Sequence, residues 1–313
     1  MRKVCKDDFF RIRRWIYKFA RHLDVMRFQY YFEKGSKEAV LEALLMYQNE
    51  DGGFGHGLEF DCQNPNSSLT QTLCAYDILK DLNCVSKQDS IIIKMINFFE
   101  NNEYITEKGC YCTIPSNNHY PCCPWYLFSD APFDWAMASE NYTNNAFIDF
   151  VFENFTKDSE LYKKALRIID YRLSVLPDLA TVFSIEKSDI MQSFKADDRF
   201  RFIKILENYN LKSHDECEML LHNLLEVMKN IANPIVYKNF QKNIRLKNDV
   251  NSDELDEVVD NLCNNKDWST DGLKCDNPEK KMNEMSSLGY LWWPIYNLID
   301  QLKLIKNHGR LEI

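Results

Sequence analysis

Glycine and proline are scarce in this sequence, with 9 of each in 313 residues. A β-sandwich of this size would need more of them, because its many tight turns use the backbone angles that these two residues favour. There is also no stretch rich in serine and glycine that would act as a linker. The composition therefore predicts a helical protein with a single domain over residues 1–313.

Long apolar runs are absent as well, and none approaches the roughly 20 residues that a membrane-spanning helix needs. The first eight residues are polar and lack the apolar core of a signal peptide. We therefore expect a cytoplasmic protein with no integral membrane segment. In that compartment the 11 cysteines, an odd number, are expected to be reduced thiols and not a disulfide framework.

Positive charge is in the minority, with 38 Lys and Arg against 47 Asp and Glu. The net charge of −9 disfavours binding to the phosphates of nucleic acids, so we expect no nucleic-acid partner. The densest basic segment, residues 11–21, is interleaved with apolar residues and is typical of the solvated face of an amphipathic first helix. A contact with anionic lipid or with a phosphate is the alternative.

Apolar and aromatic residues are abundant, at 45% and 13% of the chain, so much aromatic surface must face a core or a cavity. Apolar residues three and four positions apart predict amphipathic helices. Serine, aspartate or asparagine precedes several of them, as expected where a side chain caps a helix start. The predicted helices cover residues 36–47, 67–79, 89–99, 144–155, 161–175, 214–229, 252–263 and 287–306.

The joints between these helices repeat. Those at 47–55, 99–111 and 263–272 each end an apolar helix in Asn and acidic residues and then reach a glycine and an aromatic or apolar residue. Asn49 and Asn101 lie 52 positions apart, which divides the chain into about six units. Such a period is typical of repeat folds in which each hairpin buries its face against its neighbours.

The segment QNEDGGFG at 48–55, followed by NSSLTQTLCA at 66–75, resembles the repeat of terpenoid cyclases and protein prenyltransferase β-subunits. The likeness is specific over residues 44–79, and elsewhere the rhythm of the joints supports it. It implies an α/α toroid, with inner and outer rings of helices around an aromatic-lined cavity. The same ring serves terpene cyclisation, prenyl transfer and several carbohydrate-active chemistries, so it does not imply one substrate.

Physical reasoning supports this match. Gly52 and Gly53 permit left-handed backbone where a helix stops, so both are expected to be needed for folding. The ring of Phe54 is predicted to wedge between hairpins. The side chains of Gln48 and Asp51 are predicted to bind free backbone N–H groups of a neighbouring helix.

Two acidic residues follow the turn. The Asp-x-Asp-Asp motif with which class II terpene cyclases protonate an alkene is absent, but Glu59 and Asp61 can form a general-acid pair that His56 tunes. Loops at one rim of such a ring reach its cavity, so these three are the predicted catalytic residues. The alternative is that the acids cap the helix that starts near Asn66 or bind backbone N–H groups.

Asp197, Asp198, Arg199 and Arg201 form a second candidate site, for ligand binding. The two acids begin like the Asp-Asp-x-x-Asp motif that binds Mg²⁺-diphosphate in class I terpene synthases, but Arg201 stands where the last acid belongs. The two arginines are predicted to hold a diphosphate if the ligand carries one. The alternative is a helix N-terminus, where the dipole favours acidic side chains.

Aromatic residues supply the other ligand-binding candidates. His119, Tyr120 and Trp125 lie along residues 117–126, where prolines favour an extended path. This segment is predicted to line a pocket or to pack as a lid on the rim. Trp292, within the last predicted helix, either contacts the ligand or belongs to the core.

No metal or other cofactor is expected. The zinc of protein prenyltransferases is held by Asp, Cys and His, but Asp271, Cys275 and Asp276 form no such motif, and only His308 follows them among the histidines. The cysteines at 110, 112, 122 and 123, with a histidine at 119, lack the spaced pairs that bind zinc.

The sequence thus favours a toroid enzyme, similar to prenyltransferases or terpene cyclases, for a small apolar or isoprenoid ligand. A carbohydrate-active toroid is the first alternative, because paired carboxylates beside aromatic rings also describe a glycan site. A binding module that kept the ring without catalysis is the second. Whether the protein is an enzyme stays open at this point.

Overall fold

The computed structural model describes residues 1–128, 142–175, 189–232, 234–248, 250–265 and 289–313. Secondary structure in this part of the chain consists of α-helices and two short 3₁₀ helices, while bridge pairing is limited to isolated residue pairs. The predicted all-α fold class is therefore confirmed for the described residues.

The helices follow one another with short connections over much of the chain. The α-helices are α1 (Lys6–Phe19), α2 (His22–Phe32), α3 (Lys37–Leu45), α4 (Leu69–Asp81), α5 (Ser90–Glu100), α7 (Tyr142–Asn154), α8 (Glu160–Val175), α10 (Asp189–Asn208), α11 (His214–Ile231), α12 (Pro234–Asn248), α13 (Ser252–Asn264) and α15 (Gly289–Asn307). The 3₁₀ helices are η1 (Pro115–His119) and η2 (Pro124–Tyr126).

Several helix starts are set by side-chain caps, as the sequence predicts. Ser36 accepts a hydrogen bond from the backbone N–H of Ala39 at the start of α3, and Ser68 accepts one from Gln71 at the start of α4. Asn251 caps α13 in the same way. These bonds satisfy N–H groups that have no partner inside the helix.

Among the α-helices that the structure describes, three lie outside the predicted set: α2, α10 and α12. Residues 20 and 21 have extended backbone and separate α2 from α1, although no glycine or proline marks the break. α10 packs against α7, α11 and α12, so apolar residues occupy several of its faces. A one-sided periodicity is not expected of a helix that is covered on several sides.

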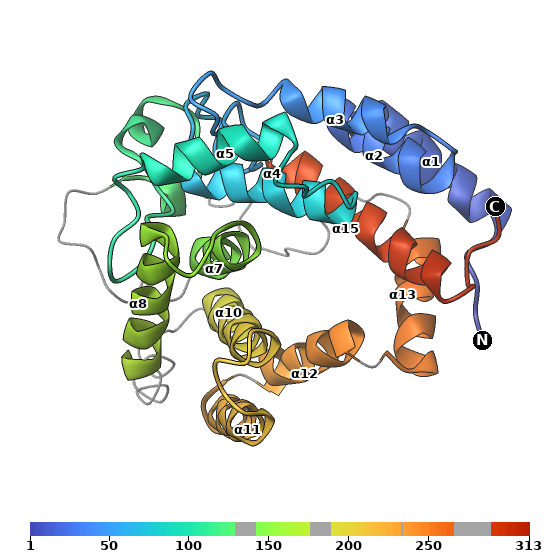
Figure 1. The fold of residues 1–313 in the computed structure, drawn as a ribbon. Coiled ribbons are helices and arrows are strands. Elements are labelled where there is room, and N and C mark those ends of the chain that lie inside the picture. Colours follow the sequence, from blue (N-terminus) through green and yellow to red (C-terminus); the bar gives the residue numbers. More distant parts are fainter. Residues whose placement is uncertain (129–141, 176–188, 233, 249, 266–288) are drawn as a thin grey trace.

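The last helix returns to the first ones (Figure 1). α15 packs against α1, α2 and α13, and α13 also packs against α1. The two chain ends pair directly: the N–H of Val4 donates to the carbonyl of Arg310 at 2.9 Å, and the N–H of Glu312 donates to the carbonyl of Val4 at 3.0 Å. The ends of the chain therefore lie side by side.

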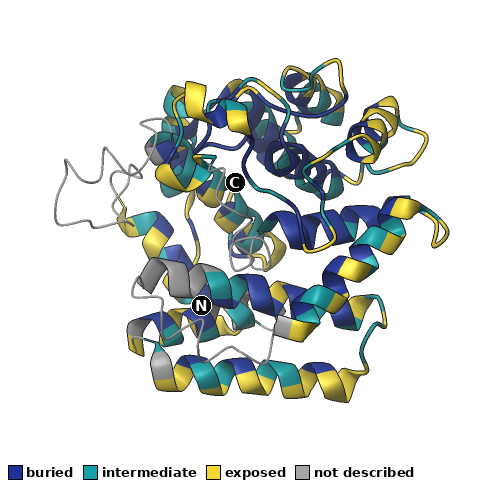
Figure 2. Cartoon of the chain, turned by 90° about the vertical axis from the view of Figure 1, so that its left-hand side faces the viewer, coloured by how far each residue is buried: buried dark blue, intermediate teal, exposed yellow. Residues whose placement is uncertain are grey.

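Two apolar clusters form the core. The larger runs through α3, α4, α5, α7, α8, α10 and α11 and contains the fully buried Phe54 of the glycine turn, as expected for a wedging ring. The smaller joins α1, α2, α13 and α15. Many helices are buried along one side and exposed along the other (Figure 2), which is the pattern that amphipathic helices produce when their apolar faces meet.

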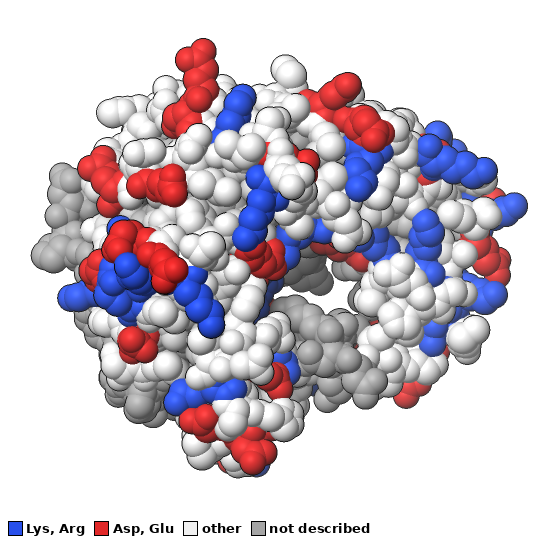
Figure 3. Space-filling view, viewed as in Figure 1, with Lys and Arg blue, Asp and Glu red and all other residues white. Residues whose placement is uncertain are grey.

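The surface in the view of Figure 3 carries charges of both signs, intermixed. The same view shows an opening in the region where Figure 1 places α12, α13 and α15. Among the helices that the structure describes, none is long and apolar enough to span a membrane.

Candidate active site

The glycine turn lies directly against the backbone of α5. Gly52 has a φ of +90°, and a Cβ atom at this position would lie 2.1 Å from the carbonyl oxygen of Lys94. A Cβ atom at Gly53 would lie 2.6 Å from atoms of Phe98 and Ser67, but its backbone is not left-handed. Left-handed backbone thus explains Gly52, whereas Gly53 is required by close packing.

The side chains of Gln48 and Asp51 bind backbone groups of the turn itself, and Asp51 also accepts a hydrogen bond of 2.7 Å from the hydroxyl of Ser67. Gln48 donates to the carbonyl of Gly52 at 3.1 Å, and Asp51 accepts from the N–H of Gly53 at 2.9 Å. The prediction that Gln48 and Asp51 satisfy N–H groups of a neighbouring helix is therefore wrong. The turn's own groups are closer, and Ser68 already caps the nearest helix start.

Glu59 and Asp61 lie in the loop between this turn and α4, and both are buried, at 5% and 6% exposure. Glu59 Oε2 accepts a hydrogen bond of 2.9 Å from the backbone N–H of Asp61. The alternative of helix capping is wrong, because Ser68 caps α4. The alternative of backbone binding is confirmed for Glu59, although its partner belongs to its own loop.

The segment 115–126 holds this loop from one side. The N–H of Cys123 donates to the carbonyl of Asp61 at 2.8 Å, and the N–H of Gln63 donates to the carbonyl of Pro121 at 2.9 Å. The side chain of Asn117, 1% exposed, donates to the carbonyl of Tyr126. These bonds fix the position of Tyr126, whose hydroxyl hydrogen-bonds to Glu59.

Aromatic side chains of α15 cover the loop. The ring of Phe60, which stands between the two acids, lies 4.8 Å from that of Trp293 and 5.7 Å from that of Tyr296 between centroids, both edge to face. Trp292, a candidate from the sequence, lies 6.5 Å away. The adjacent Trp293, which the sequence did not single out, is therefore closer to the acid loop than Trp292.

The environment of Glu59 favours its protonated form. Burial, and after it the charge of Asp61, raise the pKa of Glu59 to about 8. The N–H of Asp61, the Tyr126 hydroxyl and the Arg21 guanidinium oppose the rise. A carboxyl group that keeps its proton near pH 7 is suited to act as a general acid.

Asp61 differs from Glu59 in its surroundings. Burial raises the pKa of Asp61 too, but interactions with the side chains of Trp293, Cys123 and Trp125 oppose the rise. Among the described residues, none donates a hydrogen bond of ordinary geometry to its Oδ1. Trp125 is 44% exposed, so it links the buried acids to the surface. The pair thus combines one acid that retains its proton with a second that has spare acceptor capacity.

The raised pKa of Glu59 makes folding stability depend on pH. The folded state holds this proton more tightly than the unfolded chain does, so the stability contribution is complete below the ordinary pKa of 4.5 and is lost as pH rises through about 8. We expect wild type to lose more stability than Glu59→Gln between pH 5.5 and 8.5. Urea unfolding of both proteins at the two pH values measures this, and equal losses would contradict it.

The control for this comparison is Glu50→Gln. Glu50 is exposed in the same turn, so its removal should leave the pH dependence of wild type unchanged. Other buried carboxyl groups with raised pKa, such as Asp77 and Asp149, titrate alike in all three proteins and cancel in the difference.

Arg21 is a site residue that sequence reasoning missed. It was assigned with residues 11–21 to a solvated face, but it is only 8% exposed, so that interpretation is wrong for this residue. Its Nη1 donates to the carbonyls of Gly57 and Leu58 at 3.0 Å, and its Nε pairs with Asp24 at 2.8 Å. The break at residues 20–21 turns Arg21 away from the face of α1, and no glycine or proline in the sequence marks that break.

The three remaining candidates near the acids occupy other positions. His56 is exposed with a φ of +60°, and its Nε2 lies 2.8 Å from Oδ1 of Asn49. His119 and Tyr120 are exposed at the end of η1. The structure therefore brings Trp125 and Trp292 to the acid loop and holds the side chain of His56 on the outer side of the turn.

The candidates at 197–201 lie in the middle of α10, so the alternative of a helix N-terminus is wrong. Asp198 is buried and pairs with Arg172 of α8 at 2.7 Å, and it also bonds to Asn145 of α7. Arg199 is buried, Asp197 is half-buried and Arg201 is exposed. Asp197 and Arg201, four positions apart, lie on one face of the helix, whereas the carboxylate of Asp198 is already engaged between α7, α8 and α10.

Within the described residues, no group of three or more His, Cys, Asp and Glu side chains is arranged to hold a metal ion. Burial raises the pKa of Cys110 well above its ordinary value and that of Cys112 to about 11, so both thiols stay protonated at neutral pH. Asp271, Cys275 and Asp276 lie outside the described residues.

Comparison with known proteins returns no relative: no family model, no curated protein and no solved structure matches this chain.

Proposed function

We propose that this chain is an acid catalyst built on an α/α toroid and that it acts on an apolar, isoprenoid-like ligand. The observation that carries the proposal is the buried pair of Glu59 and Asp61, enclosed by aromatic rings from η2 and α15. Clusters of ionisable groups with shifted pKa values are typical of functional sites.

The toroid part of the proposal is supported by the order of helix contacts. Helices that are close in the sequence pack on one another in successive sets: α2 on α3, α4 on α7, α7 on α8 and α10, α10 on α11 and α12, and α13 on α15. α15 then packs on α1 and α2, and the chain ends pair through Val4. A closed ring of hairpins accounts for these contacts and for the repeated joints of the sequence.

The proposed chemistry starts from the proton of Glu59. Transfer of this proton to one carbon of a C=C double bond leaves a carbocation on the other carbon and a carboxylate on Glu59. The π faces of Phe60, Trp293 and Trp292 stabilise such a cation, because aromatic faces attract positive charge. Asp61 accepts a proton that the cation later loses to form a new double bond, and exchange with solvent then restores Glu59.

A carbohydrate-active enzyme is the second candidate. One observation favours it: Trp125 is 44% exposed next to Asp61, and an exposed tryptophan beside carboxyl groups provides a surface on which a sugar ring can stack. In that reaction Glu59 would protonate a glycosidic oxygen, and Asp61 would activate water or form the covalent intermediate.

The test compares wild type, Glu59→Gln and the exposed control Glu50→Gln with two sets of probes. Farnesol, farnesyl diphosphate and squalene represent isoprenoids, and soluble cello- and malto-oligosaccharides represent glycans. We expect conversion of an isoprenoid probe, detected by gas chromatography with mass spectrometry, and a decrease of at least about 100-fold in Glu59→Gln, as for loss of a general acid. Glu50→Gln should retain full activity.

Each other outcome contradicts a stated part of this proposal. Conversion of the oligosaccharides alone would show that the site belongs to a carbohydrate-active enzyme. Binding of a probe without conversion would favour a non-catalytic module. Unchanged turnover in Glu59→Gln would exclude the acid pair as the catalytic centre.

A further inference from the structure

Arg21 contacts residues that precede Glu59 in the sequence and the residue that follows it. Its guanidinium donates to the carbonyl groups of Gly57 and Leu58, which precede Glu59, at 3.0 Å each. Its Cζ lies 4.1 Å from the ring centroid of Phe60, which follows Glu59. The backbone before the acid and the side chain after it are therefore held by a single side chain.

The same guanidinium connects this loop to other parts of the molecule. Its Cζ lies 5.3 Å from the ring centroid of Trp292 in α15, and its Nε pairs with Asp24 in α2. The charge of Arg21 acts on Glu59 as well, since it opposes the rise in the pKa of that carboxyl group. The two carbonyl groups, the ring and the carboxylate together need a planar, forked cation, which arginine provides and lysine does not.

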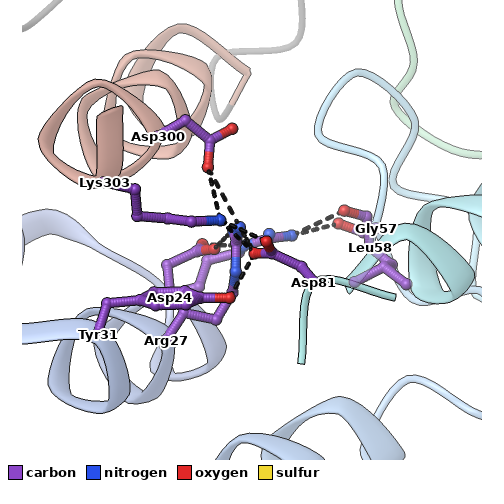
Figure 4. A network of polar contacts seen from close by, with 9 residues as sticks. Asp24, Arg27, Tyr31, Gly57, Leu58, Asp81, Asp300 and Lys303 are labelled. Atoms are coloured by element: carbon purple, nitrogen blue, oxygen red, sulfur yellow. Dashed lines mark hydrogen bonds and ion pairs between the residues drawn. The ribbon is translucent and has the colours of Figure 1, made fainter. Parts of the chain in front are cut away.

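Asp24 is shared with a second buried arginine, Arg27. Arg27 Nη1 lies 3.5 Å from Asp24, and its Nη2 lies 3.7 Å from Asp300 of α15 and 3.8 Å from Asp81 of α4. Figure 4 shows these contacts in one view, together with the carbonyl oxygens of Gly57 and Leu58. The acid loop is thus connected by successive polar contacts to α2, α4 and α15.

We propose that Arg21 is the positioning residue of the acid site: it holds Glu59 in place through the groups on either side of it and brings positive charge to that buried carboxyl group. This inference rests on the proposed function for its catalytic meaning, but its electrostatic content does not require a substrate. Among the residues that the structure describes, the ionisable groups that interact with Glu59 are Asp61, Cys62, Tyr126, Cys74 of α4 and Arg21. Arg21 is the cation among them.

The experiment measures the ionisation of Glu59 in the full chain. Glutamate labelled with ¹³C at the side-chain carboxyl is followed by NMR from pH 5 to pH 10, and the signal that disappears in Glu59→Gln identifies the residue. In Arg21→Met we expect the midpoint of this titration to rise by about one unit, because an opposite charge nearby stabilises the carboxylate by that order. Asp24→Asn, which removes the counter-charge of Arg21, should lower the midpoint.

The opposite signs separate positioning from a merely structural role. If Arg21 only supported the fold, its loss would admit water, and the midpoint would fall towards 4.5 in Arg21→Met. An unchanged or lowered midpoint in Arg21→Met would therefore overturn the proposal. If Arg21→Met does not fold, Arg21→Gln, which keeps an N–H donor for one carbonyl and loses the charge, gives the same reading.

Arg13→Met is the matched control. Arg13 lies on α1, pairs with Glu33 and is partly exposed, so its removal changes the net charge equally without reaching the acid loop. In Arg13→Met the titration midpoint of Glu59 should equal that in wild type. An equal rise of this midpoint in Arg13→Met and Arg21→Met would overturn the proposal. If the midpoint of Glu59 rises in Arg21→Met but the wild-type protein converts no probe, Arg21 remains the electrostatic partner of Glu59 and the proposed function is rejected.

Discussion

Gly52→Val should prevent stable folding. The side chain would have to occupy the space of the Lys94 carbonyl, 2.1 Å from the Cβ position, while the backbone holds a φ of +90° that β-branched residues avoid. Backbone strain of about 1–3 kcal/mol and overpacking of similar size predict a loss of about 4 kcal/mol, a large share of the stability of an ordinary domain. Soluble yield and thermal unfolding measure it.

Gly309→Val is the matched control for this prediction. Gly309 also has a positive φ, +67°, but no atom lies within 4 Å of a Cβ added there. The same substitution therefore introduces the backbone strain without the overlap and should cost about 1–2 kcal/mol. If the two variants unfold at the same temperature, the close approach of the turn to α5 does not contribute to stability.

Asp198→Ala should be the second most damaging substitution. Arg172 and Asp198 are both buried, at 3% and 6% exposure, and their side chains pair at 2.7 Å between α8 and α10. Removal of the carboxylate leaves the guanidinium charge buried with Asn145 as its remaining hydrogen-bond partner, which costs about 3–5 kcal/mol. Urea unfolding at pH 7 tests this value.

The exposed pair of Arg167 and Glu107 provides the comparison. Both side chains are about half exposed, so Glu107→Gln should change stability by about 1 kcal/mol or less. A value for Asp198→Ala as small as this would show that the buried pair does not stabilise the fold.

The helices that were predicted correctly share a local cause. α3 and α4 begin at serine caps and continue with apolar residues on one side, and both properties can be read within a few residues of the chain. α10 differs because its buried residues face several neighbours. The identity of those neighbours depends on how the helices pack, so the pattern within α10 does not reveal it.

The acid site also combines features that the local sequence predicts with features that only packing decides. Glu59 and Asp61 follow a recognisable turn, and their proximity follows from their spacing, so the sequence identified the pair. The burial of the pair does not follow from this spacing: both side chains are at most 6% exposed. Segments around Tyr126 and Trp293, more than 60 positions along the chain, cover them.

Local information in the chain was thus sufficient for the helical class, most helix starts, the strained glycine at 52 and the acid pair. The role of Arg21 and the pairing of Arg172 with Asp198 depend on contacts between residues that are 26 or more positions apart. Such contacts arise when apolar faces pack, and packing selects which polar groups lose water and must find partners. Composition and spacing carry no record of that selection, so these residues could be identified only in the folded chain.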